Sequence, residues 1–492
     1  MNDFVASIML MGAMASTDGY LPYWMTTNQY GLMPERRGGL ALLQVYSQSD
    51  ESRTIQYSCG VSLATNAYHN PLDPSSRTVN LMADELYGSV KWKLLTLDIG
   101  IKHRENDFIG ASRELGSLSV TGGHLVETGN ARSMPGYLLS LEPVSLPWTR
   151  EHLWLYGAYG DYMTMDDRHV EGALVHRMRV GLRYAATHRL SFDAVIDHYA
   201  MWAGHHPTDV SYPVTIKNYI KVVTGRHAGE GGTMSDRLNV IGDHGGSEIF
   251  RVTYRADKWT VTAQHDIPYS DGSGMGFYNF PDGVNTLSFS FTDKNRWVSD
   301  ILYEHQYTLY QSGPINGEIF DDKGNSITPP GVSTVGIDDY FANAYYRSGW
   351  TYHGRVIGDP LFLPRGVHEQ TWTSARVNRG IENNRVKSHH LGLGGKLFRK
   401  HPYKLMLTYT ENYGIYAAPY IGESQIQKPW GTVHETGLKQ ISAAFTGQIE
   451  SVFRIPGLSV LYGLYLDKGQ LYQDAIGLTV GVRYTIGRGK VR

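Results

Sequence analysis

IGLTVGVRYTI, residues 476–486, alternates between large apolar side chains and small or polar ones. Successive side chains of a β-strand point to opposite faces of the sheet, so this stretch predicts a strand with one apolar face. The apolar face carries Ile476, Leu478, Val480, Val482, Tyr484 and Ile486. A soluble sandwich also contains such strands, so the meaning of the pattern depends on how often it recurs.

The same alternation recurs along the whole chain. It is clear at 95–102, 177–184, 287–292, 403–410 and 458–466. Stretches of about 9 to 11 residues are long enough for tilted strands to cross the hydrocarbon layer of a membrane. Arginines in mid-strand, opposite an apolar face, fit a polar lumen better than a packed core, because a buried charge needs a partner. The chain is therefore predicted to be an all-β protein, a transmembrane antiparallel β-barrel.

The number of strands follows from counting these stretches and the turns between them. The count is about eighteen, with sixteen as the alternative, since single-chain bacterial barrels have an even number of strands. The expected strands are 4–15, 39–48, 54–66, 79–92, 94–104, 133–142, 151–163, 172–187, 188–202, 246–256, 258–267, 284–293, 296–311, 384–399, 402–413, 434–452, 457–468 and 473–486. Short turns at 91–93, 399–402 and 454–457 are expected on the periplasmic side.

The composition agrees with one outer-membrane barrel spanning 1–492. The chain contains 34 Tyr and 10 Trp, residues typical of the two membrane interfaces. No stretch approaches the ~18 apolar residues of a transmembrane helix. A net charge of −2 gives no support for nucleic-acid binding. The single cysteine, Cys59, is expected to be a small buried apolar residue.

Residues 4–15, FVASIMLMGAMA, allow two interpretations. The stretch resembles the apolar core of a signal peptide, with Ala13 and Ala15 spaced as at a cleavage site, but no Lys or Arg precedes it. We favour the first strand of the barrel, with the export signal outside this numbering.

Two long insertions interrupt the strand pattern. Within 203–244, the segment PVTIKNYIKVV (213–223) has apolar residues at helical spacing, which predicts a helix with Pro213 near its first turn. The longest insertion is 312–380. Loops of this length are usually functional when they are ordered. In a wide barrel such helical and loop segments are expected to fold inward and occlude the lumen.

The chain shows no motif for catalysis or for a bound cofactor. It lacks the GxSxG, HExxH, phosphate-loop and paired-cysteine patterns. The pairs His205–His206 and His389–His390 are poor metal sites, because neighbouring residues on a strand point to opposite faces. We therefore expect no catalytic residues, no metal and no cofactor. An outer-membrane enzyme that modifies lipid or glycan remains an alternative.

Insertion 312–380 contains residues suited to sugar recognition. Aromatic rings stack on the C–H faces of sugars, and planar polar groups such as guanidinium bind their hydroxyls. The candidate polysaccharide-binding residues here are Tyr345, Tyr346, Arg347, Trp350, Tyr352, His353 and Arg355. The alternative is that these aromatic residues pack the insertion into the mouth of the barrel.

Three arginines in the 172–187 strand are expected to face the lumen. Arg177, Arg179 and Arg183 alternate with its apolar residues. We favour ion pairs with acidic residues of the plug over contact with a ligand.

Several motifs together resemble the Wzi-type capsule-assembly outer-membrane proteins, in the form common in Bacteroidetes. The matching segments are STDGYLPYWMTTNQYGL (16–32), ETGNARSMPG (127–136), QSGP (311–314), DDYFANAYYRSGWTYHGRVIGDPLF (338–362) and NNRVKSHHLGLG (383–394). They occur in the same order as in that family and cover nearly the whole chain. The first two segments add Trp24 and Arg132 to the candidate polysaccharide-binding residues.

The resemblance implies an eighteen-stranded outer-membrane barrel that is occluded rather than open. It implies a non-enzymatic, lectin-like role, in which exported capsular or surface polysaccharide is bound and attached to the cell surface. The expected partners are this polysaccharide, the surrounding outer-membrane lipid and, as a further candidate, the polysaccharide export machinery. A transport pore for oligosaccharides or nutrients is the main alternative.

Overall fold

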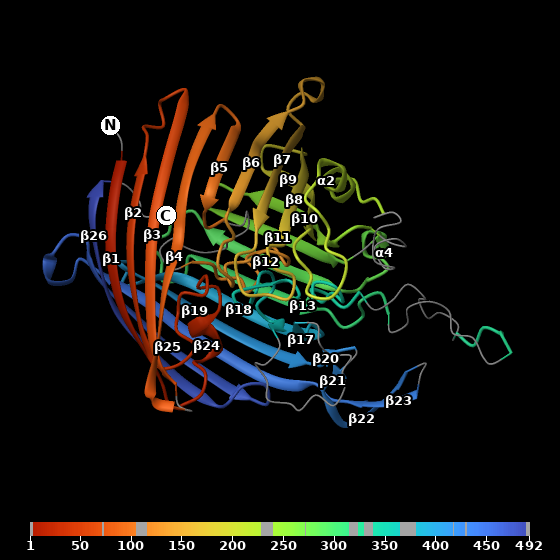
Figure 1. The fold of residues 1–492 in the computed structure, drawn as a ribbon. Helices are drawn as coiled ribbons and strands as arrows, with labels where there is room; N and C mark the ends of the chain where they lie inside the picture. The colour runs from red at the N-terminus through yellow and green to blue at the C-terminus, as the bar shows by residue number, and fades with distance from the viewer. Residues whose placement is uncertain are drawn as a thin grey trace.

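The computed structural model describes residues 3–70, 73–104, 116–227, 240–270, 272–313, 323–328, 338–364, 380–416, 418–428 and 431–488. Eighteen strands in this part of the chain form one antiparallel sheet (Figure 1). They are β1 (Asp3–Ala15), β2 (Gly38–Gln48), β3 (Ile55–Asn70), β4 (Asp73–Trp92), β5 (Leu95–Ile101), β6 (Gly136–Ser145), β7 (Leu153–Met163), β8 (Leu174–Ala185), β9 (Leu190–Trp202), β10 (Asp243–Arg255), β11 (Trp259–Tyr269), β12 (Gly283–Phe291), β13 (Asp300–Tyr307), β18 (Val386–Leu397), β19 (His401–Asn412), β24 (Leu438–Glu450), β25 (Leu458–Gly469) and β26 (Ala475–Arg488).

The sheet closes into a barrel because β1 pairs with both β2 and β26. Ile8 of β1 lies opposite Leu43 on one side and Tyr484 on the other. The predicted fold class and all eighteen predicted strands are confirmed. The ends differ by a few residues, most at β4, which begins at Asp73 instead of residue 79. The segment 4–15 is the strand β1, as favoured from the sequence.

Smaller elements occupy the insertions. The described short strands pair as β14 (Thr351–Tyr352) with β15 (Arg355–Val356), β16 (Leu363–Pro364) with β17 (Ile381–Asn383), β20 (Gly414–Ile415) with β21 (Ala418–Pro419), and β22 (Ile421–Lys428) with β23 (Gly431–Glu435). The described α-helices are α1 (Tyr23–Thr26), α2 (Ile216–Val223) and α4 (Gly272–Met275), and Pro147–Thr149 and Val452–Arg454 are 3₁₀ turns. Helix α2 begins three residues after Pro213, with Thr215 as its N-cap. Parts of the predicted insertions, 228–239, 314–322, 329–337 and 365–379, lie outside the described residues.

The outer surface of the barrel is apolar and the inner surface is polar. On β26, Ile476 is 62% exposed and Val480 is 50% exposed, while Thr479 between them faces inward and is 3% exposed. Cys59 of β3 is exposed, so the expectation that it is buried is wrong. It follows an outward-facing residue, Tyr57, by two positions, and so it faces outward too. Apolar side chains facing outward from a closed barrel place the protein in the outer membrane.

Across the described ranges, every helix is too short or too polar to span a membrane.

The two ends of the barrel differ. Because the strands are antiparallel, both chain ends and the turns β4–β5, β18–β19 and β24–β25 lie at one end. The insertions 16–37, 102–135, 203–242 and 308–385 leave the opposite end. In barrels of this class short turns face the periplasm and long loops face outward. The three predicted short turns therefore lie on the same side, the periplasmic one.

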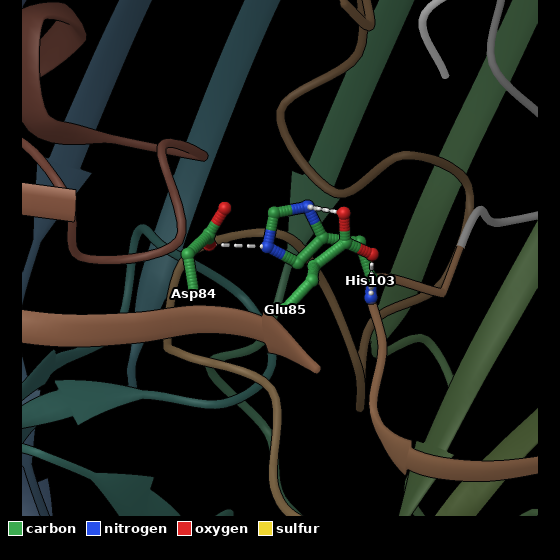
Figure 2. A group of neighbouring side chains, drawn as sticks. All are labelled: Asp84, Glu85 and His103. Atoms are coloured by element: carbon green, nitrogen blue, oxygen red, sulfur yellow. Dashed lines mark hydrogen bonds and ion pairs between the residues drawn. The ribbon is translucent and has the colours of Figure 1, made fainter. Parts of the chain in front are cut away.

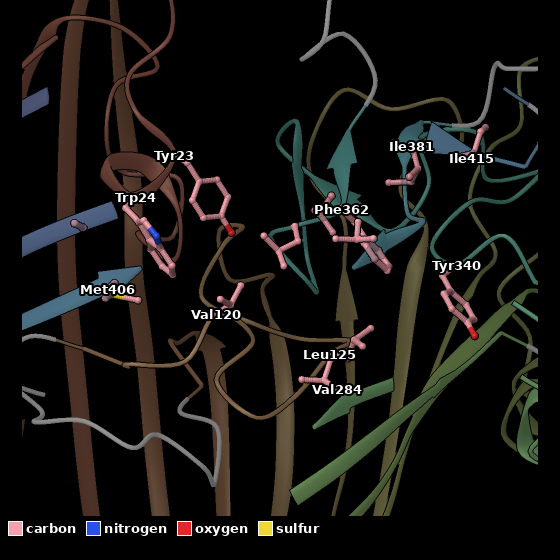
Figure 3. Packing of buried hydrophobic residues seen from close by; sticks show 14 residues of the cluster. Tyr23, Trp24, Val120, Leu125, Val284, Tyr340, Phe362, Ile381, Met406 and Ile415 are labelled. Atoms are coloured by element: carbon pink, nitrogen blue, oxygen red, sulfur yellow. The ribbon is translucent and has the colours of Figure 1, made fainter. Parts of the chain in front are cut away.

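Inserted segments pack inside the barrel and form a plug. The plug is defined here as the described parts of 16–37, 116–135, 338–364 and 380–385. One hydrophobic core joins residues of these segments to wall residues Val284, Met406 and Ala444 (Figure 3). The plug side of this core includes Trp24, Val120, Leu125, Tyr340, Val356, Phe362 and Ile381. The interior at this level is therefore filled by close-packed side chains.

Carboxylates on the barrel wall hold the backbone of the plug. Asp467 of β25 accepts from the Tyr23 N–H at 2.8 Å, and Asp266 of β11 accepts from the Leu125 N–H at 2.8 Å. Glu304 of β13 accepts from the Thr121 N–H at 3.2 Å. Irregular backbone has few partners of its own, and a buried N–H without an acceptor is costly. These acidic residues supply the missing acceptors.

A charged residue placed on the lipid-facing surface should lower the free energy of unfolding of this barrel more than one placed toward the lumen. Leu10 faces outward near the middle of β1, whereas Met11 lines a lumen cavity of about 810 Å³. Leu10→Arg should lower the free energy of unfolding by about 2–4 kcal/mol. Met11→Arg, its neighbour, should cost much less. Urea titration of the protein folded into liposomes measures both, and equal losses would contradict the assignment of the two faces.

The free energy needed to open the plug should decrease as pH rises between about 4 and 7. Burial raises the pKa of Asp359 to about 7, with a further contribution from Asp266. In this range the unfolded carboxyl is ionised and the folded one is protonated, so the stability of the plug falls as pH rises. Asp359→Asn should reduce this slope, measured by hydrogen exchange of the plug amides after correction for intrinsic rates. An unchanged slope would show that Asp359 does not titrate in this way.

Candidate functional site

Four of the residues predicted from the sequence meet in one pocket at the outer end of the barrel. They are Arg132, Tyr352, His353 and Arg355. The cavity measures about 70 Å³, and its other lining residues are Gly31, Met33, Glu35, Asn66, Tyr68 and Asn80. We call these ten residues the mouth pocket. Its walls come from three plug segments and from the outer ends of β3 and β4.

A tight hairpin presents two of the pocket residues. Strands β14 and β15 are joined by His353 and Gly354, with φ angles of 49° and 75°. Positive φ at both central residues is the requirement of a type I′ turn, and Gly354 meets it without strain. The His353 N–H donates to Asp166 at 3.0 Å, which anchors the turn to the loop after β7. His353 is exposed at the tip, and Arg355 returns into the pocket.

Two positively charged side chains of the pocket, Arg132 and Arg355, pass over the backbone at Gly31. An added Cβ at Gly31 would lie 3.4 Å from Arg355 Cδ and 3.6 Å from Arg132 Cγ, so both arginine stems pass over this glycine. Burial lowers the pKa of Arg355, and Arg132 lowers it further while Glu35 raises it. Burial and then Arg132 also lower the pKa of His353. A negatively charged group would relieve this repulsion, and a hydroxyl group would accept hydrogen bonds from the guanidinium groups.

Amide side chains form the barrel side of the pocket. Asn80 donates to Asn66 at 2.9 Å, and Asn66 donates to the Leu32 carbonyl at 2.8 Å. Arg355 donates to the Thr26 carbonyl at 3.2 Å. The plug is therefore fixed to β3 at the pocket itself, and β4 supports the contact through Asn80. Together, guanidinium, amide, phenol and imidazole groups in a small cleft are suited to hold one polar substituent of a larger ligand.

Three of the predicted aromatic residues are buried away from the pocket and contact protein, whereas Tyr352, equally buried, also lines the pocket. Trp24 donates from its indole to Thr408 at 3.1 Å, and Trp350 donates to the Val126 carbonyl at 2.7 Å. Tyr346 donates to the Ala203 carbonyl at 3.2 Å. All three are under 10% exposed. Their rings pack the plug, which is the alternative considered for this segment, so we leave them out of the mouth pocket.

The remaining predicted residues of this segment lie apart from the mouth pocket. The Tyr345 ring lies 4.5 Å from that of His206, and its hydroxyl donates to the Val210 carbonyl at 2.6 Å. Arg347 is exposed and donates to the Ala344 carbonyl at 3.2 Å. The segment 338–364 therefore has two parts. The part around Tyr345 packs against the insertion after β9, and the hairpin β14–β15 forms part of the mouth pocket.

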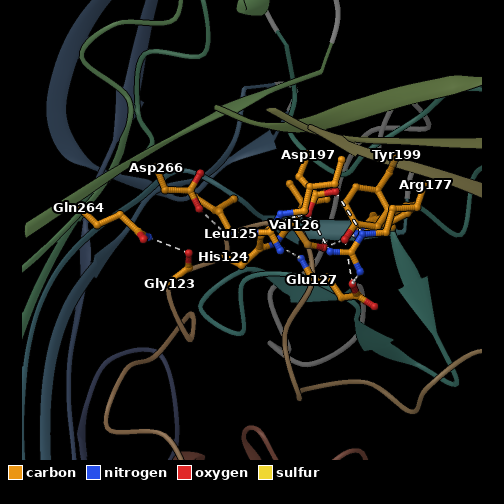
Figure 4. A network of polar contacts seen from close by, with 12 residues as sticks. Gly123, His124, Leu125, Val126, Glu127, Arg177, Asp197, Tyr199, Gln264 and Asp266 are labelled. Atoms are coloured by element: carbon orange, nitrogen blue, oxygen red, sulfur yellow. Dashed lines mark hydrogen bonds and ion pairs between the residues drawn. The ribbon is translucent and has the colours of Figure 1, made fainter. Parts of the chain in front are cut away.

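The three predicted lumen arginines face carboxylates of the wall and of the plug. Arg177 donates to Asp197 of β9 at 2.7 Å and to Glu127 of the plug at 2.6 Å (Figure 4). Arg179 lies 3.7 Å from Asp197, and Arg183 pairs with Asp193 of β9 at 2.8 Å. The plug supplies one of these acidic partners, and the neighbouring strand supplies the other two.

One further cluster on the inner wall was not predicted from the sequence. A β-bulge places Glu85 opposite Ser62 and Ala83 opposite Leu63, so Asp84 is an extra residue between them. Asp84 and Glu85, although adjacent, both turn to His103 (Figure 2).

Within the described residues this cluster is the group of three whose metal-ligating atoms lie within 4.8 Å of one another. His103 Nε2 is 2.6 Å from Asp84 Oδ1, and the Tyr30 ring stacks on the imidazole at 3.5 Å. The hydrogen bond between His103 and Asp84 holds the imidazole on which Tyr30 of the plug stacks, and this accounts for these contacts.

Solved structures similar to this chain are outer-membrane barrels. Wzi of Escherichia coli, an outer-membrane protein involved in group 1 capsule assembly and a carbohydrate-binding β-barrel, is 12% identical with a TM-score of 0.52, over 97% of this chain and 83% of that one. OccK5 (OpdH) of Pseudomonas aeruginosa has a TM-score of 0.44 at 8% identity, over 99% and 98% of the two chains. A BenF-like porin from Pseudomonas fluorescens Pf-5 has 0.46 at 8%, over 99% of each chain.

No protein-family model and no curated protein sequence matches the chain. At these identities the similarity to Wzi concerns the fold. The class defined by the fold is therefore an eighteen-stranded outer-membrane β-barrel with a packed plug.

Replacing Trp350 should disrupt the plug rather than remove a ligand contact. Trp350→Ala removes a buried ring and its hydrogen bond, so the local opening free energy of the plug should fall by about 3–5 kcal/mol. Arg347→Ala, on the same segment but exposed, should change it by less than about 0.5 kcal/mol. Hydrogen exchange of the amides around Val126 and Trp350 measures both. Similar values for the two variants would refute the packing role.

Proposed function

We propose that the protein is a non-enzymatic member of the Wzi-type group that binds exported capsular or surface polysaccharide and attaches it to the cell surface. The observation that carries this proposal is the mouth pocket. Residues from plug segments more than 200 positions apart, Arg132 and Arg355, converge there on the outer side of the barrel. The similarity of the fold to a carbohydrate-binding barrel adds support.

The small size of the pocket determines how a polymer would be held. A cavity of about 70 Å³ has room for a substituent such as a carboxylate or a hydroxymethyl group, not for a whole sugar chain. A long polymer offers many copies of the same substituent. Attachment then arises from repeated weak engagement, on this barrel and on its neighbours in the membrane. No bond is made or broken in this scheme.

A transport pore is the second candidate, and the lumen cavities favour it. Cavities of about 500 Å³ and about 810 Å³ lie beside the plug. A pore requires these spaces to connect the two ends of the barrel. Single-channel conductance in planar bilayers would support this alternative, whereas the packed core of the plug leads us to expect a closed barrel.

The two guanidinium groups of the mouth pocket provide the test. Arg132→Gln together with Arg355→Gln should weaken binding of the cell's own surface polysaccharide about tenfold or more, because hydrogen bonds to a charged group contribute about 1.5–3 kcal/mol each. Polysaccharide retained on cells and polysaccharide released into the medium are measured in parallel. Arg399→Gln, in an exposed periplasmic turn, is the matched control and should behave as the wild type. Unchanged retention in the double variant would refute the pocket's role.

A further inference from the structure

A second cavity, of about 500 Å³, lies against the inner wall formed by β6 to β11. We call it the arginine vestibule because six arginines line it: Arg104, Arg177, Arg179, Arg183, Arg251 and Arg255. Neither the mouth pocket nor the plug core includes Arg179, Arg183, Arg251 or Arg255.

The vestibule lies on the periplasmic side of the plug. Strands β8 and β10 both run toward the short-turn end, and Arg183 and Arg255 stand near that end. Ser140 to Pro143, near the same end of β6, complete the wall. Arg177 marks the inner boundary, since it lines the cavity and also binds Glu127 of the plug (Figure 4). A ligand would therefore reach the vestibule from the periplasm.

Positive charge is in excess among the described residues here. Two carboxylates, Glu142 and Asp193, line the cavity with the six arginines. Asp197 and Glu127 lie behind Arg177, Arg179 and Arg104 and pair with them. Glu142 itself is bound by Lys91. Arginines held side by side at a polar wall repel one another, and an anion placed among them would lower that energy.

Hydrogen bonds from the wall orient the two arginines of β10. Arg251 Nε donates to Gln264 Oε1 at 2.9 Å, and an Nη of Arg255 donates to Ser191 at 3.4 Å. These bonds fix the planes of the two guanidinium groups. A guanidinium has five N–H donors, so the single bond from Arg255 to Ser191 leaves further donors of Arg255 for a ligand. A guanidinium fork matches the two oxygens of a carboxylate or phosphate.

The rest of the lining is partly apolar. Leu138, Leu141, Pro143 and the ring of Tyr156 border the cavity between the arginines. A ligand for this site should therefore combine an anionic group with C–H surface. Acidic sugars have this combination, and the volume is in the range of cavities that bind small organic ligands.

We infer that the arginine vestibule binds acidic saccharide units, carboxylated or phosphorylated, that reach the barrel from the periplasmic side. The anion site stands on the geometry alone. The choice of a saccharide as the carrier of the anion rests on the proposed function.

The test uses the full-length protein purified in detergent, with the mouth pocket disabled by Arg132→Gln and Arg355→Gln. Titration calorimetry with an oligogalacturonate should show binding that weakens as ionic strength rises, and a neutral malto-oligosaccharide should not bind. Adding Arg255→Gln should weaken oligogalacturonate binding about tenfold, the loss expected for one charge-assisted contact. Because Arg255 is exposed, this variant should fold normally. Arg251→Gln tests the neighbouring position, and Arg454→Gln, in an exposed turn at the same end, is the control.

The outcomes separate this inference from the proposed function. Affinity that is unchanged by both Arg255→Gln and Arg251→Gln would overturn the vestibule site, whatever the mouth pocket does. Equal binding of the neutral oligosaccharide would also overturn it. Competition by inorganic phosphate at the concentrations at which oligogalacturonate binds would keep the anion site and overturn the saccharide assignment. Failure of the proposed function would appear elsewhere, as normal polysaccharide retention on cells that carry the mouth-pocket variant.

Discussion

The structure depends on the acceptors that the barrel wall provides for irregular backbone inside it. A plug of loops has many N–H groups that no helix or sheet satisfies, and leaving them unpaired in a packed interior would be costly. Asp266, Glu304 and Asp467 project from three separate strands and accept these hydrogen bonds. The wall thus carries two patterns at once. Its outward residues match the lipid, and its inward residues match particular amides of the plug.

This arrangement gives the molecule two unlike polar surfaces. On the outer side, the hairpin β14–β15 and the segment that contains Arg132 form the mouth pocket against β3 and β4. On the periplasmic side, the wall beneath the plug carries the arginine vestibule. Arg177 belongs to both the vestibule and the network that holds the plug. A change in how the plug sits would therefore alter the charge presented to the periplasm.

The barrel could be predicted from the sequence because its signal is local. In each strand the polarity of the side chains alternates with a period of two. Because lipid covers one face, that face must be apolar throughout, so the stretch 476–486 already shows the alternation found in the other strands. The resemblance to Wzi-type proteins added the expectation of a plug, and the similarity to the solved structure of Wzi concerns the barrel fold. Arg132, Tyr352, His353 and Arg355 line one pocket, and their role in binding polysaccharide stays a prediction.

The division between residues that only pack the plug and buried residues that also line the pocket could not be predicted. Trp350 and Tyr352 are two positions apart, yet Trp350 is locked to Val126 while Tyr352 lines the pocket. The difference comes from the segment around Val126, more than 200 residues away in the chain. The cluster at Asp84 and Glu85 was missed for another reason. Alternation assigns neighbouring residues to opposite faces, and a single extra residue in β4 breaks that rule without any mark in the sequence.

We propose that this barrel holds polysaccharide at the cell surface. The most direct measurement compares polysaccharide attached to cells with polysaccharide shed into the medium, in a strain that lacks the protein and in its parent. If the protein attaches the polymer, total synthesis should be normal in the strain that lacks the protein, with the polymer moved from the cells to the medium. Normal attachment in the strain that lacks the protein would contradict it.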